Sequence, residues 1–354
     1  MDLRKTIYVA THWEKWHYRV KYIPLTPAWL WYCLRARSWW FFTPSNPSLT
    51  FGGFEGESKM EMYRQLPYHT YPRSILIQTG SVFEEAEKKF ADQHMSYPFA
   101  VKPDVGMMGF MFRKIDNRKA WQEYHQKMPV DYIAQELAVF PIEVSVFYYR
   151  FPAEQKGTIT GFLRKEGLEV SGDGISTLEQ LIQQHPRARF LMKEMRSKHA
   201  TRLQEVLPKD KLFILSWAAN LSRGGKLVNL EHEKDEKLLK VFDYLSHYTT
   251  HFLYGRYDIK CASVADLKEG KNFTILEYNG SGAEPHHVYG NGNNLFQASK
   301  ILLHHWKILY RISVLNHHNG IPYWKFNDGW KFLKQARKHF KLLKQLDRES
   351  MNPH

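Results

Sequence analysis

The stretch EYNGSGAEPHH, residues 277–287, follows the apolar residues Ile275 and Leu276, so that a predicted strand runs into a glycine-rich loop. Successive side chains of a strand point to opposite faces, so Glu277 and Asn279 would lie on one face. A carboxylate and an amide oxygen that converge at a strand end suit a hard divalent cation such as Mg²⁺. An Asn-Gly pair after a strand is also typical of an ordinary turn, and these residues alone favour the turn.

A second polar pair lies in the sequence GRYD, where Arg256 and Asp258 alternate onto one face of another predicted strand. The segment NFTILEYN, residues 272–279, is its expected hairpin partner. Pairing of the two strands would bring Arg256 and Asp258 next to the first polar pair. Three oxygen ligands and a guanidinium on one sheet face can hold metal-bridged phosphates and stabilise charge on a transferred group.

Farther toward the amino terminus, a lysine and a glycine loop follow another predicted strand. Lys102 lies in the strand FAVKPD, and Gly106 and Gly109 lie in the loop VGMMG. Glycines let backbone N–H groups approach a phosphate that a lysine neutralises, although a simple hairpin has the same pattern. Next, Gln-Glu-Leu at 135–137 suggests a linker whose backbone binds the edge of an adenine. The carboxylate of Glu143, which follows, could bind ribose hydroxyls. Exposed charges on two strands are the alternative.

The secondary structure expected around these motifs is a mixture of helices and hairpin-like strand pairs, which indicates the α+β class. Strands are expected at 73–78, 99–104, 110–115, 132–137 and 142–150. Helices are expected at 27–40, 57–66, 116–127, 178–185 and 233–253. Ser81 with Glu84 predicts a capping box before a further helix, and residues 169–177 are expected to form a loop.

The composition predicts a folded cytoplasmic protein. Of 354 residues, 43% are hydrophobic and 15% aromatic, which suffices for a large core. Cys33 and Cys261 are the only cysteines in the sequence, which argues against a disulfide scaffold or a cysteine-based zinc site. The amino terminus has no apolar stretch of signal-peptide length. The aromatic segment 28–42 is too short to span a membrane and is expected to form a buried cluster.

The formal net charge of +14 requires an acidic partner such as nucleic acid, anionic lipid or a phosphate-bearing ligand. Residues 325–348 contain eight Lys/Arg and two Asp. Residues at three- and four-residue steps form a stripe there, apolar except for Arg337: Trp330, Leu333, Arg337, Phe340, Leu343 and Leu346. We expect the stripe to pack on the protein. Peripheral docking of this helix on the anionic inner face of a membrane is the alternative.

The order of these motifs resembles the ATP-grasp superfamily, most closely its D-alanine:D-alanine ligase and cyanophycin-synthetase branch. That order is a strand with Lys102 and a glycine loop, the Gln-Glu-Leu linker, Arg-x-Asp and Glu-x-Asn. EVSGDGISTLEQLI (169–182) and NLSRGG (220–225) also resemble stretches of cyanophycin-synthetase-type domains. The resemblance covers about residues 57–290. It implies an ATP-grasp fold, in which two α+β subdomains grip ATP between antiparallel sheets.

The implied organisation has a reduced, aromatic-rich amino-terminal region (1–56) and a basic carboxyl-terminal helical extension (311–354). Between them, an ATP-grasp domain (57–310) would consist of subdomains 57–137 and 138–310. Family ligases usually place a full substrate domain before the first lysine. The short amino-terminal region therefore leaves the substrate open.

The resemblance also implies roles for individual residues. Those expected to bind ATP are Lys59, Lys102, Gly106, Gly109, Glu136, Leu137 and Glu143. Those expected to hold Mg²⁺, as two ions and with Mn²⁺ as an alternative, are Asp258, Glu277 and Asn279. Arg256 would act in catalysis by stabilising the acyl phosphate and the tetrahedral oxyanion. Substrate contacts are expected from Gly282, Glu284 and His286, where Glu284 would recognise an amine or sugar hydroxyls.

The implied enzyme is an ADP-forming ligase that joins a carboxylate to an amine or thiol through an acyl phosphate. Its partners would be small-molecule carboxylates and amines, with no nucleic acid. One alternative is an ATP-grasp kinase that stops after phosphoryl transfer. Another is a basic protein that binds nucleic acid or membrane and keeps a vestigial ATP site.

Overall fold

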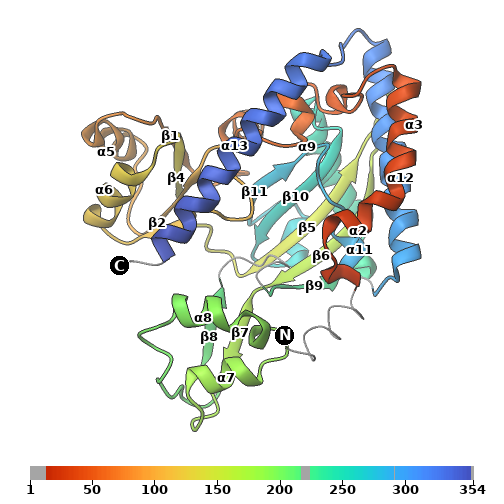
Figure 1. Ribbon diagram of the computed structural model, residues 1–354. Helices are drawn as coiled ribbons and strands as arrows, with labels where there is room; N and C mark the ends of the chain where they lie inside the picture. Colours follow the sequence, from red (N-terminus) through yellow and green to blue (C-terminus); the bar gives the residue numbers. More distant parts are fainter. Residues whose placement is uncertain (1–12, 217–223, 291, 352–354) are drawn as a thin grey trace.

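The computed structural model describes residues 13–216, 224–290 and 292–351 of the chain. The charged amino terminus (1–12) and residues 220–223 of the NLSRGG stretch lie outside these ranges. The described residues form two antiparallel sheets, a small two-stranded sheet and the helices that cover them (Figure 1). This arrangement confirms the expected α+β class.

The first sheet has the strand order β1-β4-β2-β3. Its strands are β1 (Ser74–Ile77), β4 (Tyr132–Glu136), β2 (Phe99–Pro103) and β3 (Arg113–Ile115). Helices α5 (Phe83–Asp92) and α6 (Arg118–Lys127) pack against it. Phe90 from α5 and Trp121 from α6 are buried with Phe99 of β2 in one core.

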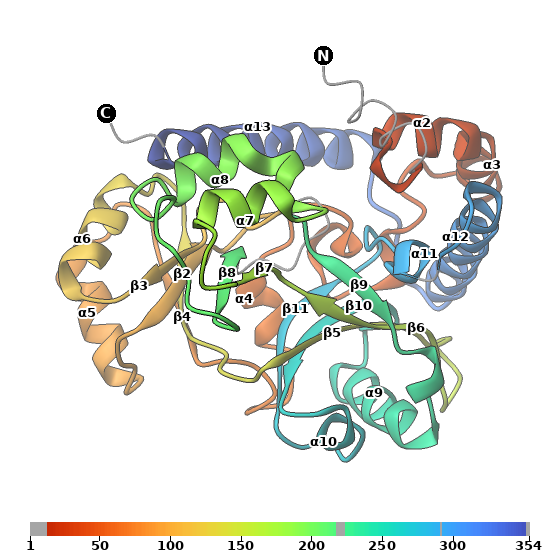
Figure 2. The ribbon, with the colours of Figure 1, turned by 90° about the horizontal axis from the view of Figure 1, so that it is seen from below.

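The second sheet has the order β11-β10-β5-β6-β9. Its strands are β11 (Phe273–Asn279), β10 (Tyr254–Cys261), β5 (Ile142–Tyr149), β6 (Thr158–Glu166) and β9 (Lys226–Asn229). Helices α9 (Glu236–Thr249) and α10 (Val264–Lys268) lie against this sheet (Figure 2). Leu238 and Phe242 of α9 are buried with Val144 and Tyr257 of the sheet. The expected hairpin between β10 and β11 is confirmed.

A small third lobe is inserted between β6 and β9. It contains β7 (Leu168–Ser171), β8 (Leu212–Ser216), α7 (Leu178–Gln184) and α8 (Met192–Lys198). Leu178, Met195 and Leu215 belong to its own core. In Figure 1 this lobe lies apart from the first sheet and its helices.

The remaining helices come from the two ends of the chain and from the connection after β11. They are α2 (Tyr18–Tyr22), α3 (Thr26–Ala36), α4 (Lys59–Tyr63), α11 (His287–Gly290), α12 (Leu295–His318) and α13 (Phe326–Met351). Short 3₁₀ helices occur at Trp13–Lys15, Ile23–Leu25, Thr43–Ser45, Thr50–Gly53, Ala188–Leu191 and Glu231–Glu233. The expected aromatic cluster is confirmed in part, because Phe41, Phe42 and Phe51 are buried together.

Helix α13 joins the two sides of the molecule, as both ribbon views show (Figures 1 and 2). Its Leu333 packs with the amino-terminal aromatic residues, and its Phe340 and Leu343 pack in the core of the first sheet. The expected packing of the apolar stripe is therefore confirmed, except at the exposed Trp330. Membrane contact through this stripe is not supported, because protein already covers it.

Several local expectations need correction. Helix α5 begins after Val82 without a side-chain cap, and the Ser81 hydroxyl donates to the Gln78 carbonyl, so no capping box forms there. Residues 169–171 belong to β7 rather than to a loop. The expected returning strand at 110–115 is shortened to β3, because Met108 and Met111 have positive φ.

Helix lengths and boundaries were also expected differently. Helix α3 ends at Ala36 because Arg37 adopts a left-handed conformation. Helix α12 continues across residue 310, where the second subdomain was expected to end. The division of the chain into domains stays a prediction.

Candidate active site at the ends of strands β10 and β11

The centre of the candidate site is the face that β10 and β11 present together. The antiparallel register places Asp258 opposite Glu277 and Arg256 opposite Asn279. Alternation puts all four side chains on one face, as the sequence predicts. The two carboxylates therefore come together through backbone pairing alone.

Glu277 is held by a lysine from a distant helix. Lys59 Nζ lies 3.0 Å from Glu277 Oε1 and also donates to the Gly106 carbonyl at 3.1 Å. Helix α4 places the lysine there because Ser58 caps its first turn and Asp104 accepts the Met60 N–H. One ammonium thus connects strand β11 to the glycine loop after β2.

Asp258 lies in a cluster of buried charges. Arg256 donates to both of its carboxylate oxygens, and Lys165 Nζ lies 2.9 Å from Oδ1. Lys165 also lies 3.3 Å from Glu143 Oε1, and its side chain is only 3% exposed. Lys165 therefore joins the expected ribose carboxylate to the expected metal carboxylate.

Sequence reasoning missed Lys165 because strand β6 was not identified. The alternation of TITGFLRKE was the available signal, since it marks a strand whose Lys165 pairs with Glu143 of β5. Tyr63 was missed as well. Its hydroxyl accepts a hydrogen bond from Lys102 Nζ at 3.3 Å and donates one to the Leu276 carbonyl.

The protonation states of the carboxylates follow from these contacts. Burial acts to raise the pKa of Asp258, but Arg256 and Lys165 hold it well below its usual range. Burial likewise opposes the charge of Glu277, yet Lys59 lowers the pKa of that carboxyl. Burial raises the pKa of Glu143, and Lys165 only partly compensates. Asp258 and Glu277 are thus ionised at neutral pH.

The two lysines of the site differ in their charge. The pKa of Lys59 is raised, because Glu277 outweighs the effect of burial. For Lys102, burial and the neighbouring Lys59 lower the pKa to about 7. Lys102 is therefore a group that a bound phosphate would convert from partly neutral to charged.

We expect nucleotide affinity to fall as pH rises above 7, because phosphate favours the protonated form of Lys102. The dissociation constant for Mg-ADP should increase by up to about tenfold per pH unit. Calorimetric titrations between pH 6.5 and 8.5 measure this slope. The Lys102→Arg variant stays charged over this range, so an equal slope in that variant contradicts the assignment.

The stability of the free protein should depend on pH with the opposite sign. The unfolded lysine keeps its proton up to about pH 10.4, whereas the folded one loses it near 7. The unfolded state thus binds more protons between these values, and this group makes the folded state more stable as pH rises.

The other residues expected to bind the nucleotide have different environments. The backbone carbonyl of Gly106 accepts a hydrogen bond from Lys59. A Cβ added at Gly109 would have no heavy atom within 4 Å. Glu136 turns to solvent and pairs with Arg73 at 2.9 Å. Leu137 is half-buried at the start of the link between β4 and β5. Roles for Gly109, Glu136 and Leu137 stay predictions.

The expected substrate residues occupy the loop after Asn279. The Cα of Gly282 is packed so closely that a Cβ would lie 1.9 Å from the Phe54 carbonyl oxygen. Oε1 of Glu284 accepts hydrogen bonds from the hydroxyls of Tyr22 and Tyr289, and its backbone carbonyl accepts one from Arg256. Gly282 and Glu284 therefore have a structural role in this loop. Their contacts with a substrate stay predictions.

His286 has a different environment. Burial and the nearby Arg256 hold its pKa well below the usual range, so the imidazole is neutral. Its Nδ1 is buried and has no hydrogen-bond partner among the described residues. A buried unsatisfied nitrogen beside Arg256 is a group that a bound substrate can satisfy.

The chemical types of the side chains on this face suit a hard cation such as Mg²⁺. Two ionised carboxylates and the amide of Asn279 share one face, and the Asn279 Nδ2 atom is buried without a partner within the described residues. In the described part of the chain, no three His, Cys, Asp or Glu side chains form a group that could hold a metal ion. Both carboxylates are neutralised by protein cations instead.

Helix α13 holds both ends of the glycine loop. His339 Nε2 donates to the Val105 carbonyl at 2.7 Å. The buried Asp347 accepts the Met111 N–H at 2.9 Å and pairs with Arg113 at 3.1 Å. The basic carboxyl-terminal helix therefore positions the loop that carries Gly106.

We expect Asp347→Asn to loosen residues 104–112, because a buried charge-assisted hydrogen bond is weakened. Hydrogen exchange of these amides should accelerate by at least about tenfold, with little change in α5. The control is Glu349→Gln, an exposed acid on the same helix. Equal exchange in the two variants contradicts a positioning role for Asp347.

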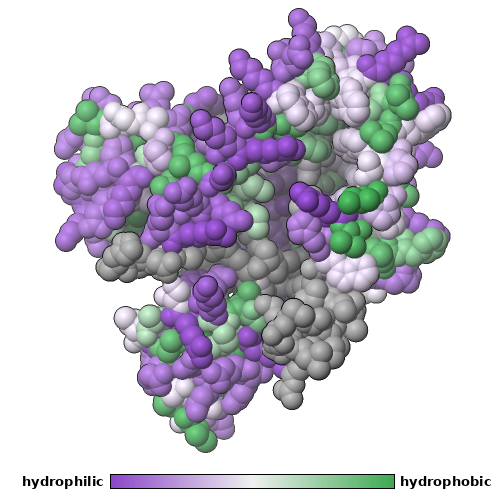
Figure 3. Space-filling view, in the orientation of Figure 1, coloured by the Kyte–Doolittle hydropathy of each residue, from purple (hydrophilic) through white to green (hydrophobic). Residues whose placement is uncertain are grey.

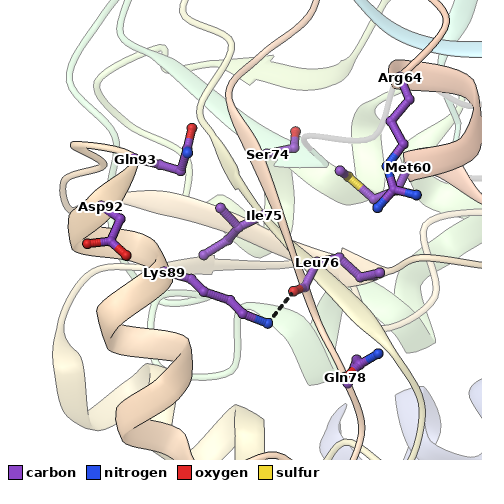
Figure 4. Close-up of a pocket in the computed structure, with 9 residues that line it drawn as sticks. All are labelled: Met60, Arg64, Ser74, Ile75, Leu76, Gln78, Lys89, Asp92 and Gln93. Atoms are coloured by element: carbon purple, nitrogen blue, oxygen red, sulfur yellow. Dashed lines mark hydrogen bonds between the residues drawn. The ribbon is translucent and has the colours of Figure 1, made fainter.

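A cavity of about 490 Å³ lies beside β1, between α4 and α5 (Figure 4). Its lining includes Arg64, Leu76 and Lys89, and Lys89 Nζ reaches the Leu76 carbonyl. None of the expected site residues lines this cavity. The chemistry described above therefore lies outside it.

No protein-family model matches the chain, and no curated protein matches it. Among solved structures, D-alanine–D-alanine ligase from Bacillus anthracis matches with 10% identity and a TM-score of 0.39, over 74% of this chain and 68% of that one. The bifunctional glutathione synthetase from Pasteurella multocida matches with 14% identity and a TM-score of 0.36, over 68% of this chain and 34% of that one.

The ATP-grasp ligase PsnB, in a structure with Mg, ADP and a phosphomimetic variant of its minimal precursor, also matches. Identity is 14% and the TM-score 0.37, over 70% of this chain and 58% of PsnB. This chain spans only about a third of the glutathione synthetase. Similarity of this degree identifies no activity, so function must be inferred from the side chains of the site.

Within the described residues, no helix combines the length and apolar character needed to cross a membrane.

Proposed function

We propose that the protein is an ATP-dependent ligase that joins a carboxylate to an amine or thiol, releasing ADP and phosphate. The observation that carries this proposal is the pairing of Asp258 with Glu277 across β10 and β11, each neutralised by a lysine from another part of the chain. The two carboxylates are surrounded by four cationic side chains, those of Lys59, Lys102, Lys165 and Arg256. A polyphosphate can bind to these cations while divalent cations bind to the carboxylates, so that new ion pairs replace the present ones.

The residues divide into those that bind nucleotide and those that hold the metal. Lys59 and Lys102 would contact phosphate oxygens, and Glu143 would hold ribose hydroxyls. Asp258, Glu277 and Asn279 would hold Mg²⁺, which when bound neutralises phosphate charge. Lys59 would then move from Glu277 to phosphate, because a cation at Glu277 replaces its charge.

In the first step, a substrate carboxylate oxygen bonds to the γ-phosphorus, and the bond between that phosphorus and ADP breaks. In the second, the amine or thiol attacks the acyl carbon and phosphate leaves. Arg256 donates two hydrogen bonds to the Asp258 carboxylate and one to the Glu284 backbone carbonyl. Its other two donors can stabilise the oxyanion of the second step.

The test combines thermal stabilisation with product analysis. Mg-ADP should raise the melting temperature of the protein, since a ligand that binds only the folded state stabilises it. ADP release is then screened against panels of carboxylates with and without amines, amino sugars or thiols. A requirement for both substrates supports a ligase, and turnover with one alone indicates a kinase. Neither stabilisation nor ADP release would overturn the proposal.

A further inference from the structure

Helices α2 and α3 expose an apolar stripe that nothing in the described protein covers. One side of α3 packs inward through Trp29, Tyr32 and Cys33. The opposite side carries Leu30, Trp31 and Leu34, and Leu34 is 72% exposed. We call the exposed apolar residues of this segment the α2–α3 face: Val20, Ile23, Leu30, Trp31, Leu34 and Trp39. Figure 3 shows apolar side chains over these two helices.

The sequence around this face carries an excess of positive charge, although Glu284 accepts a hydrogen bond from Tyr22 of α2. Residues 15–54 contain five Lys/Arg and no Asp or Glu, and residues 285–327 contain four Lys/Arg and again no acid. The second segment supplies α12, which lies beside α3 (Figure 1) and stacks Tyr310 on Tyr32 at 4.8 Å. The two basic segments are therefore neighbours in the fold, and we call them together the basic flank.

Exposed basic residues lie close to the apolar ones. Arg35 lies over the ring of Trp31 at 5.9 Å, and both Arg35 and Arg37 are exposed at the carboxyl end of α3. Tryptophan and leucine flanked by arginine are typical of helices that lie in a membrane interface, where rings and apolar chains enter the headgroup region. Each nearby basic residue adds attraction to anionic lipid.

We propose that the α2–α3 face docks on the surface of an anionic lipid bilayer. A second copy of the chain fits less well, because a symmetric contact would place one basic flank against another. Nucleic acid fits less well too, because aliphatic side chains such as Ile23 and Leu34 contact neither phosphates nor stacked bases. The proposal is independent of the ligase activity, and it concerns a different surface from the packed stripe of α13.

Co-sedimentation of the full chain with vesicles tests the proposal. We expect binding to phosphatidylglycerol-containing vesicles, little binding to phosphatidylcholine alone, and release at high salt. Arg35→Gln combined with Arg37→Gln should weaken binding about thirtyfold. Trp31→Ser combined with Leu34→Ser should weaken it by roughly tenfold or more. Melting temperatures show that each variant is folded.

Matched controls change equally exposed residues elsewhere. Ile175→Ser with Leu212→Ser removes apolar surface from the third lobe, where these residues are 83% and 61% exposed. Lys119→Gln with Lys127→Gln removes two exposed charges from α6. Both controls should bind as the parent does, and equal losses in controls and test variants would overturn the proposal.

Two further outcomes would also overturn it. In the first, the protein does not bind vesicles but self-associates, and Trp31→Ser with Leu34→Ser abolishes the self-association. The face would then be an interface between copies of the chain. Binding to an oligonucleotide without binding to anionic vesicles assigns the basic flank to nucleic acid. Analytical ultracentrifugation and fluorescence anisotropy measure these outcomes on the same preparations.

Discussion

The Glu277→Gln variant is expected to lose Mg²⁺-dependent ADP formation by at least about 100-fold. Glu277 is one of two ionised carboxylates on the β10–β11 face, and it is the partner of Lys59 at 3.0 Å. Glutamine keeps the size of the side chain but cannot neutralise Lys59 or bind a cation with a full charge. Steady-state ADP release at saturating substrate measures the loss.

Glu136→Gln is the matched control for this prediction. Glu136 is also expected near the nucleotide, yet its carboxylate points to solvent and pairs with the exposed Arg73. The same chemical change there should leave ADP release within about a factor of three, because exposed ion pairs contribute little. A Glu277→Gln enzyme with near-normal turnover would remove Glu277 from the metal site.

Glu277 should also show itself in the pH dependence of stability. Because Lys59 lowers its pKa despite burial, the carboxylate stabilises the folded state above its unfolded pKa of about 4.3. This contribution is lost as pH falls through the lowered folded pKa. The difference in melting temperature between the parent and Glu277→Gln should therefore be present at neutral pH and shrink in acid.

The Lys165→Met variant is expected to lose about 3–5 kcal/mol of unfolding free energy. The Lys165 side chain is 3% exposed and lies between Glu143 and Asp258, so its removal leaves the buried Asp258 and the partly buried Glu143 with less compensation. Methionine fills a similar volume, so the loss reports charge rather than a cavity. Urea denaturation at pH 7 measures it.

Two controls separate charge from general disruption. Lys226→Met changes a lysine of the neighbouring strand whose side chain is 59% exposed, and it should change stability by less than about 0.5 kcal/mol. Adding Glu143→Gln to Lys165→Met should recover part of the loss, because one of the unpaired carboxylates is removed. A Lys165→Met protein as stable as the Lys226→Met protein contradicts the charge cluster.

The amino-acid sequence by itself determined the parts of this site that depend on local periodicity. Alternation in GRYD and ILEYN placed Arg256 with Asp258 and Glu277 with Asn279, and the hairpin that joins them forms as expected. The three- and four-residue spacing of the carboxyl-terminal stripe likewise predicted a packed helix. These features follow from the repeat of one strand or one helix, which adjacent residues encode.

Only the tertiary structure decided which cations meet these carboxylates. Lys59 and Glu277 are far apart in the chain, as are Lys165 and Asp258. Their contacts depend on helix α4 packing near β11 and on strand β6 joining the same sheet as β10, with β5 between them. The same holds for Asp347 near the carboxyl end of α13, which accepts a hydrogen bond from Met111, a residue far away in the sequence. No local repeat encodes such contacts, because burying the apolar faces of sheets and helices brings distant segments together, and ion pairs form where that packing leaves charged ends side by side.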